Sequence, residues 1–463
     1  MTTSTSRRAF LRRSGALAGA GIAATPWAMS LAGLAASASA NAAGDDYKAL
    51  VCVFLAGGND CHNTVIPLDP ASHARYAKLR GNIALPLSSL AATELVPANP
   101  WTDGRRMALA PSLAPLKSMF DAGQMSMVMN VGPLEGPLTL AQYRQGLGVP
   151  AKLFSHNDQQ STWQAGGTEG ATSGWGGRMA DLMLAGNGAN GAMFTSISAS
   201  GNAVFMSGNT VTQYQVSPTA GGAVKVLPVN GAGAGVDAKV VAAVNGLLTR
   251  SSANAFEESH AAIARRAIAT EGLVTNALGG IGDKSMIQGN SLAAQLNLVA
   301  RLIAARHAFG VKRQVFYVSL GSFDLHALAN DKQPGLHATL ANALKAFHDA
   351  TAAMGLADQV TTFTASDFGR TLSTNGDGSD HGWGSYHFVM GGAARPRTWV
   401  GQLPDVAVGG AHDVGQGRLL PNVSVDQYGA TLARWMGVAD GDLRTVFPNL
   451  GNYGVVDLGF LKS

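Results

Sequence analysis

Aspartate and histidine residues are concentrated in four short stretches of the chain, and these residue types are common protein ligands of divalent metal ions. Carboxylates and imidazoles bind such an ion when several of them converge from separate segments, and the bound ion then polarises an ester or activates a nucleophile. The stretches GGNDCHNT, GSFDLH, SDFGRT and DHGWGSYH contain Asp60, Asp324, His326, Asp367, Asp380, His381 and His387. Together they predict a metal or catalytic site, although any one of these aspartates alone is more typical of a turn or a helix cap.

Three of the four stretches follow an apolar run that is typical of a buried β-strand. These runs are YKALVCVFL at 47–55, QVFYVSL at 314–320 and QVTTFT at 359–364. In open α/β sheets, ligands bind outside the carboxyl ends of the strands. We therefore expect the aspartates that follow the three strands to lie close together at one edge of a sheet.

Helical patterns alternate with these strands along the chain. We predict one more strand and five helices, at 125–131 and at 111–123, 253–278, 291–309, 335–354 and 423–436. This alternation favours an α/β fold in which helices sandwich a mostly parallel central sheet. The stretch 166–236 is rich in Gly, Ala, Ser, Asn and Thr and is typical of turns and short strands. We therefore expect an insertion at about 167–290.

The composition gives no indication of nucleic-acid binding. The formal net charge is +4, and four arginines within the first 13 residues account for it, so the rest of the chain is near neutral. The two cysteines are Cys52, inside a predicted strand, and Cys61. Their spacing predicts neither a disulfide framework nor a CxxC metal motif.

The first 40 residues are typical of a twin-arginine signal peptide. SRRAFL at 6–11 contains the arginine pair, a weakly apolar stretch rich in Ala and Gly follows at 14–36, and ASA at 38–40 is a small-residue cleavage pattern. The alternative is a retained N-terminal membrane helix. We expect the twin-arginine translocase to export the folded protein to the periplasm or beyond, with no stable membrane anchor after cleavage.

The chain resembles the domain-of-unknown-function 1501 family over most of its mature length. The resemblance rests on LVCVFLAGGNDCHNTVIP, SFDLH, SDFGRT, DHGWG, VDQYGATLARWMGV and VFPNL. That family is in turn similar to the alkaline phosphatase and sulfatase superfamily. The resemblance implies an alkaline phosphatase-like domain at 45–463, with two metals held by Asp and His at strand ends and a nucleophile at a helix start. The sulfatase pattern Cys-x-Pro-Ser-Arg is absent, so formylglycine chemistry is not expected.

The resemblance implies a set of metal ligands, which are Asp60, Asp324, His326, Asp367 and His381. Two features depart from the phosphatase pattern. One residue separates Asp324 from His326 where phosphatases have three, and Phe368 follows Asp367 where they have histidine. One metal ion, or a degenerate site, fits these residues as well as two ions do. The expected ion is zinc, or else magnesium, manganese or calcium.

Two further residues are candidates for the chemistry. Ser155 lies in FSHN at a predicted helix start, where the resemblance implies the nucleophile, and its alternative role is an N-cap. Arg370 is suited either to binding an anionic ester through two N–H groups or to forming a salt bridge with a nearby carboxylate. The neighbouring His156 is a ligand, a base or a structural residue.

These observations lead to two hypotheses of different classes. The first is an exported metal-dependent hydrolase that acts on phosphate or sulfate esters of small molecules. The second is a non-catalytic binding or assembly protein on a degenerate phosphatase-like scaffold. Because one fold hosts many functions, the completeness of the ligand set has to decide between them.

Overall fold

The described part of the chain is built around one large mixed sheet. The computed structural model describes residues 46–101, 103–223 and 237–462, so the signal peptide predicted at 1–40 lies outside the described residues. Ten strands of the described chain form this sheet, in the order β14-β5-β13-β10-β1-β9-β6-β7-β8, with β15 paired to β5. Their bounds, in the same order, are Trp399–Val400, Met125–Gly132, Ser385–Met390, Val360–Ser366, Lys48–Leu55, Arg313–Leu320, Ser196–Ser198, Tyr214–Ser217 and Gly222–Ala223, with β15 at Val423–Ser424.

The large sheet is mostly parallel, as predicted. The strands β10, β1, β9, β6 and β7 run parallel to one another, whereas β13 and β8 run against their neighbours. The predicted strands at 47–55, 125–131, 314–320 and 359–364 correspond to β1, β5, β9 and β10. Long apolar runs of this kind are expected for strands that are covered on both faces.

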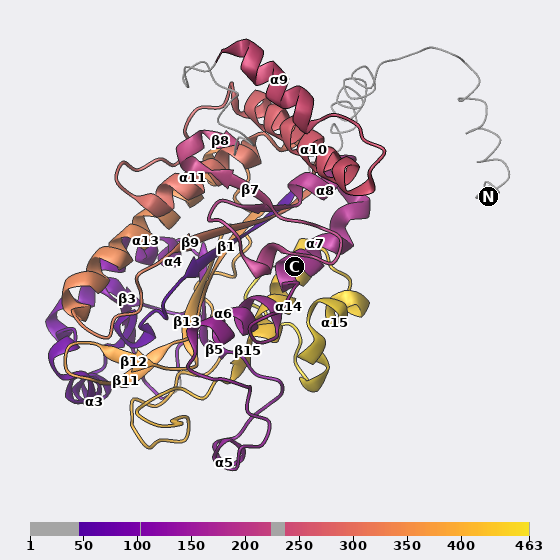
Figure 1. Cartoon of the computed structure of the whole chain (residues 1–463). Helices are drawn as coiled ribbons and strands as arrows, with labels where there is room; N and C mark the ends of the chain where they lie inside the picture. The colour runs from indigo at the N-terminus through magenta and orange to yellow at the C-terminus, as the bar shows by residue number, and fades with distance from the viewer. Residues whose placement is uncertain (1–45, 102, 224–236, 463) are drawn as a thin grey trace, which may run out of the picture. The chain divides into compact units, whose positions relative to one another are not determined.

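Helices cover both faces of the sheet (Figure 1). Alternate residues of β1 enter two different cores, with Val51 and Val53 on one face and Cys52 and Phe54 on the other. The first core contains side chains of α4 (Ala114–Asp121), α11 (Ser291–Ala304) and α13 (Ala329–Ala353). The second contains side chains of α6 (His156–Ala165), α7 (Trp175–Met183) and α14 (Val425–Met436). The predicted α/β sandwich is therefore confirmed.

The five predicted helices are present with shifted ends, and the described residues also form helices that were not predicted. The α-helices α3 to α15 are Pro70–Arg80, Ala114–Asp121, Leu140–Arg144, His156–Ala165, Trp175–Met183, Gly191–Phe194, Ala238–Leu248, Ala255–Leu278, Ser291–Ala304, Arg306–Phe309, Ala329–Ala353, Val425–Met436 and Leu443–Val446. The helix predicted at 291–309 is interrupted at Ala305, and the helix predicted at 335–354 begins earlier, at Ala329. Among the described residues, no helix combines the length and hydrophobicity that a membrane span requires.

The region predicted as an insertion contributes to the main sheet. Strands β6, β7 and β8 extend the sheet beyond β9, and α7 packs on one of its faces. Two small sheets lie apart from the main one: β2 (Val65–Pro67), β4 (Met107–Leu109) and β3 (Glu94–Leu95) form the first, and the hairpin of β11 (Arg370–Thr374) and β12 (Ser379–His381) forms the second.

The central strands end at the same level, which positions the loops that follow them. Leu55 at the end of β1 pairs in register with Leu320 of β9 and with Ser366 of β10. The loops after these strands carry the aspartates singled out in the sequence. This edge of the sheet is therefore where those side chains can meet.

Candidate metal centre

Gly57 brings the loops at this edge close together. It has φ +114°, and a Cβ atom at this position would lie 2.4 Å from the backbone nitrogen of Asp324. Its N–H donates to Asp367 Oδ1 at 3.0 Å, and its carbonyl accepts from Arg370 at 3.3 Å. A residue without a side chain is needed here because any other residue would push the Asp324 loop away.

Three imidazoles direct the same ring nitrogen towards one carboxylate. The Nε2 atoms of His326 and His381 lie 3.1 and 3.3 Å from Asp324 Oδ1, and Nε2 of His156 lies 3.4 Å from Asp324 Oδ2. The Nε2 atoms of His326 and His381 are 2.9 Å apart. Ligand atoms of His156, Asp324 and His381 all lie within 4.8 Å of one another. We call His156, Asp324, His326 and His381 the metal cluster.

The other ring nitrogen of each histidine faces a hydrogen-bond acceptor. His156 Nδ1 lies 2.6 Å from Asp367 Oδ2, and His326 Nδ1 lies 3.1 Å from Asp380 Oδ1. His381 Nδ1 lies 2.8 Å from the carbonyl oxygen of Phe154. Carboxylates and carbonyls accept hydrogen bonds, so each Nδ1 carries the proton. Each Nε2 is left with a lone pair, as is typical of metal-ligating histidines.

The cluster has the charge and the orphaned atoms that a bound cation would satisfy. Asp324, Asp367 and Asp380 each contact a histidine of the cluster, and the guanidinium of Arg370 pairs with Asp324. When the three imidazoles are neutral, as metal binding requires, these groups carry two net negative charges. Nε2 of His156 is buried and has no hydrogen-bond partner. Two lone pairs 2.9 Å apart repel each other unless a proton or a metal ion lies between them. A divalent ion therefore fits this donor set.

The surrounding groups tune the basicity of the histidines. The hydrogen bond with Asp367 holds the pKa of His156 above its ordinary value, and a more basic imidazole is also a stronger metal ligand. Burial lowers the pKa of His381 and so favours its neutral, metal-binding form. Asp367 is fully buried and also accepts from Gln160 Nε2 at 2.8 Å, so it supports His156 from behind.

Arg370 forms a salt bridge with the cluster from its buried side. Its NH1 donates to Asp324 Oδ1 at 2.6 Å, and its NH2 donates to the carbonyl of Ser379. The side chain has no exposed surface, whereas that of Asp324 is 43% exposed. Of the two roles considered for Arg370, the structure shows the salt bridge, and burial keeps its guanidinium from a substrate that enters from solvent.

Asp60 lies outside the metal cluster. Its Oδ2 pairs with the fully buried Arg80 of α3, and its Oδ1 accepts from the N–H groups of His62 and Asn63 at 3.1 and 3.3 Å. Although burial opposes ionisation, Arg80 holds the pKa of Asp60 below its ordinary value. The carboxylate that the resemblance assigns to a metal ion is thus paired with a guanidinium.

Ser155 immediately precedes the cluster at the start of α6. It occupies the N-cap position, but its side chain makes no capping bond. Its Oγ donates to Asp158 Oδ2 at 2.9 Å, so the hydroxyl is engaged within the first turn of the helix. The structure therefore confirms Ser155 at the helix start beside His156, but its hydroxyl makes no capping bond.

The sequence pattern identified Asp324, His326 and His381, which the structure brings together, but gave no definite role to three other groups. His156 belongs to the cluster, Asp380 orients His326, and the carbonyl of Phe154 orients His381. Asp367 joins this outer layer and lies behind His156. The available signal for His156 was its place at a predicted helix start beside Ser155, and a backbone carbonyl leaves no signal in a sequence.

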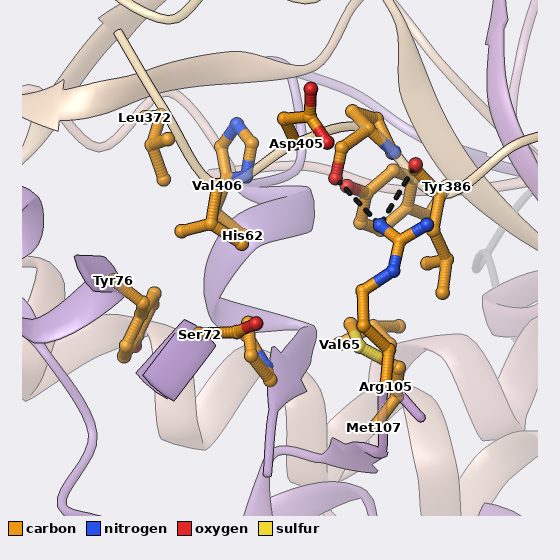
Figure 2. A pocket seen from close by; sticks show the side chains of 13 residues that line it. His62, Val65, Ser72, Tyr76, Arg105, Met107, Leu372, Tyr386, Asp405 and Val406 are labelled. Carbon is orange, nitrogen blue, oxygen red and sulfur yellow. Dashed lines mark hydrogen bonds between the residues drawn. The ribbon is translucent and has the colours of Figure 1, made fainter. Parts of the chain in front are cut away.

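A small cavity lies beside His62 and does not include the cluster (Figure 2). It has a volume of about 20 Å³ and is closed on one side by Arg105, whose NH1 donates to the carbonyls of Leu403 and Pro404 at 2.9 and 3.2 Å. This volume accommodates about one water molecule, so the cavity is too small for an organic substrate.

Comparison with protein families gives a match over residues 47–446 to the family described as "Protein of unknown function (DUF1501)". Comparison with curated proteins gives no match.

Several solved structures are similar to this chain at low sequence identity. Ps i-CgsB in complex with k-i-k-neocarrahexaose is 11% identical, with a TM-score of 0.35 and coverage of 88% of this chain and 75% of that chain. The lipoteichoic acid synthase LtaP from Listeria monocytogenes is 10% identical, with a TM-score of 0.34 and coverage of 87% and 76%. The PsFucS1 sulfatase from Pseudoalteromonas sp. is 10% identical, with a TM-score of 0.36 and coverage of 90% and 73%. Because these TM-scores are below 0.5, the similarity gives no information about the activity of this chain.

Proposed function

The chain belongs to the DUF1501 family, and we propose that it is a metal-dependent hydrolase that acts on phosphate or sulfate esters of small molecules. The observation that carries this proposal is the convergence of three imidazole Nε2 atoms on the carboxylate of Asp324, with every Nδ1 held by an acceptor. Structural metal sites are closed by protein ligands, whereas catalytic sites keep an open position. The exposed side of His326 and Asp324 therefore favours the hydrolase over the non-catalytic alternative.

The donor set favours zinc among the ions considered. Three nitrogen ligands and one carboxylate suit zinc and related transition metals, whereas magnesium and calcium prefer oxygen ligands. His156, His326, His381 and Asp324 would hold the ion. Asp60 and Asp367 are engaged elsewhere, with Arg80 and His156, and this supports one ion in place of two.

The protein's own groups divide the remaining tasks. Asp367, Asp380 and the Phe154 carbonyl orient the three imidazoles, and Arg370 fixes Asp324 from the buried side. The outer side is open, because the side chains of His326 and Asp324 are 44% and 43% exposed. A bound divalent ion supplies Lewis acidity, which stabilises the negative charge that develops on the ester oxygens. The open side gives an anionic ester access to that ion.

Elemental analysis of the purified chain tests the proposal. We expect about one zinc ion per chain in the wild type, and loss of the ion in His156→Ala and Asp324→Ala. His260→Ala is the matched control, because His260 is an exposed histidine on α10 and lies outside the cluster. Hydrolysis of p-nitrophenyl phosphate and p-nitrophenyl sulfate is then measured with metal restored to each variant.

Two results would contradict the proposed function. Protein that is purified without chelators and takes up no zinc, manganese or cobalt cannot be a metallohydrolase. Stoichiometric metal without hydrolysis of either ester class, in a broad screen, would instead support the binding-protein alternative.

We also propose that the chain is exported in folded form by the twin-arginine translocase and acts in the periplasm or outside the cell. The support is the SRRAFL and ASA pattern in the first 40 residues. Replacing Arg7 and Arg8 with lysine should retain the protein in the cytoplasmic fraction, which immunoblotting of cell fractions detects. Unchanged export of this variant would exclude the twin-arginine route.

A further inference from the structure

His381 is the cluster residue that two separate loops hold in place. The loop before α6 supplies the carbonyl of Phe154, which lies 2.8 Å from Nδ1 of His381. The loop at 409–420 supplies Arg418, whose Nε donates to the carbonyl of His381 at 2.7 Å. The two loops also contact each other, because the Arg418 guanidinium lies over the ring of Phe154 at 4.9 Å. Phe154, His381 and Arg418 thus form a closed triangle of contacts.

The loop that presents Arg418 is rigidly built. The buried carboxylate of Asp413 accepts from the backbone N–H groups of Gly409, Gly415 and Gly417 at 2.6, 2.6 and 2.8 Å. The N–H of Leu372 in β11 also donates to the carbonyl of Gly417 at 3.2 Å. These hydrogen bonds hold the backbone that carries Arg418. The contact between Arg418 and Phe154 in turn restrains the loop before α6.

Phe154 occupies an unfavourable backbone conformation. Its φ is +70°, and Lys152, two residues before it, has φ +52°. Such conformations of non-glycine residues persist only when neighbouring contacts hold them. The contact with Arg418 is one such restraint, since a cation over an aromatic face is attracted by the electrons of the ring.

We infer that Arg418 is a positioning residue for the metal ligand His381: it holds the Phe154 carbonyl against Nδ1 of His381 and so keeps Nε2 free to bind the ion. This inference rests on the proposed function, because it assigns a role within the same metal centre. The carbonyl is the acceptor found at Nδ1, and it fixes both the tautomer and the ring orientation of His381. Without the guanidinium, the loop before α6 loses its contact with the loop at 409–420, and the Phe154 carbonyl is held less firmly against His381.

The affinity for cobalt tests the inference without relying on activity. Cobalt(II) replaces zinc in nitrogen-rich sites, and its visible absorption reports the ligand geometry. We expect Arg418→Gln to weaken cobalt binding about 10- to 100-fold, the range for loss of an orienting partner, and to alter the absorption bands. Arg418→Lys keeps a cation without the planar donor fork, so it should recover part of the affinity.

Phe154→Leu provides a second, independent variant. It removes the ring and keeps the backbone carbonyl, so the same direction of change is expected even if Arg418→Gln does not fold. Arg434→Gln is the matched control, because Arg434 of α14 pairs with Asp440 and Asp457, which lie beyond that helix, and neither is a cluster residue. The thermal unfolding of every variant is measured beside its cobalt titration.

The outcomes separate this inference from the proposed function. Wild-type protein that binds no cobalt overturns the metal centre itself. Wild-type binding together with affinities within twofold, and unchanged spectra, in Arg418→Gln and Phe154→Leu overturns only the role of Arg418. Weaker binding and altered spectra in both variants, with partial recovery in Arg418→Lys, support it.

Discussion

The carboxyl group of Asp426 is buried in the first turn of α14, away from the metal cluster. It is 6% exposed, and its surroundings include the backbone N–H of Asn449 and the guanidinium of Arg178. Burial raises the pKa of Asp426 to about 6 from an ordinary value of 3.8, because the ionised form loses more hydration than its partners replace. The folded protein therefore binds this proton more tightly than the unfolded chain does.

The sign of the effect on stability follows from this difference. Below pH 3.8 the carboxyl is protonated in both states, and no penalty arises. As the pH rises through about 6, the unfolded chain has already released the proton, and the folded state becomes relatively less stable by at most about 3 kcal/mol. Asp426→Asn carries no charge and so removes this penalty. The expected gain at pH 8 is therefore at most about 3 kcal/mol.

Urea unfolding at pH 4 and pH 8 measures this gain. Asp426→Asn should stabilise the protein at pH 8 and show little or no gain at pH 4, with an unchanged slope against urea. Asp331→Asn is the control, because Asp331 also lies in the first turn of a helix but is exposed. A gain that is equal at the two pH values, or absent at pH 8, would show that burial of Asp426 carries no ionisation penalty.

Three further predictions concern the site and its supports. Asp367→Asn should weaken zinc binding about 10- to 100-fold, because the neutral amide no longer fixes the tautomer of His156, and unchanged affinity in a chelator competition would contradict this. His387→Gln should make stability less sensitive to acid: burial lowers the pKa of His387 to about 3 from 6.5, so the wild type loses stability from this group as the pH falls below 6.5. At pH 4.5 that loss is about 3 kcal/mol, and parallel pH profiles of unfolding free energy would exclude it. Gly57→Ala should destabilise the protein by more than about 1 kcal/mol and weaken metal binding, whereas Gly321→Ala, in open space, should do neither when both are measured by thermal unfolding and zinc titration.

The sheet could be predicted from the sequence because its central strands are long apolar runs. β1, β9 and β10 need such runs, since both of their faces are covered by helices. The short strands β6, β7 and β8 carry no comparable signal, and tertiary pairing to β9 places them in the sheet. The antiparallel direction of β13 also depends on its partners, β10 and β5, and not on its own residues.

The candidate site could be predicted only where its residues follow those strands. Asp324 and His326 come directly after β9, so strand-end reasoning places them at the correct edge. His156 comes from the start of a helix on another part of the chain, and its approach to Asp324 is a tertiary contact that spacing does not reveal. The ion pair between Asp60 and Arg80 could not be predicted either, because it is a tertiary contact with the last turn of α3.

The metal cluster is assembled from segments near residues 156, 324–326 and 381, which are far apart along the chain. An unfolded or partly synthesised chain therefore has no high-affinity site, and the ion can be acquired only after the hairpin of β11 and β12 has packed beside the loops that carry His156 and Asp324. The compartment in which folding is completed then decides which pool of metal ions the protein samples. If the chain crosses the membrane already folded, it binds its ion in the cytoplasm, and the metal ions available there determine which ion is bound before export.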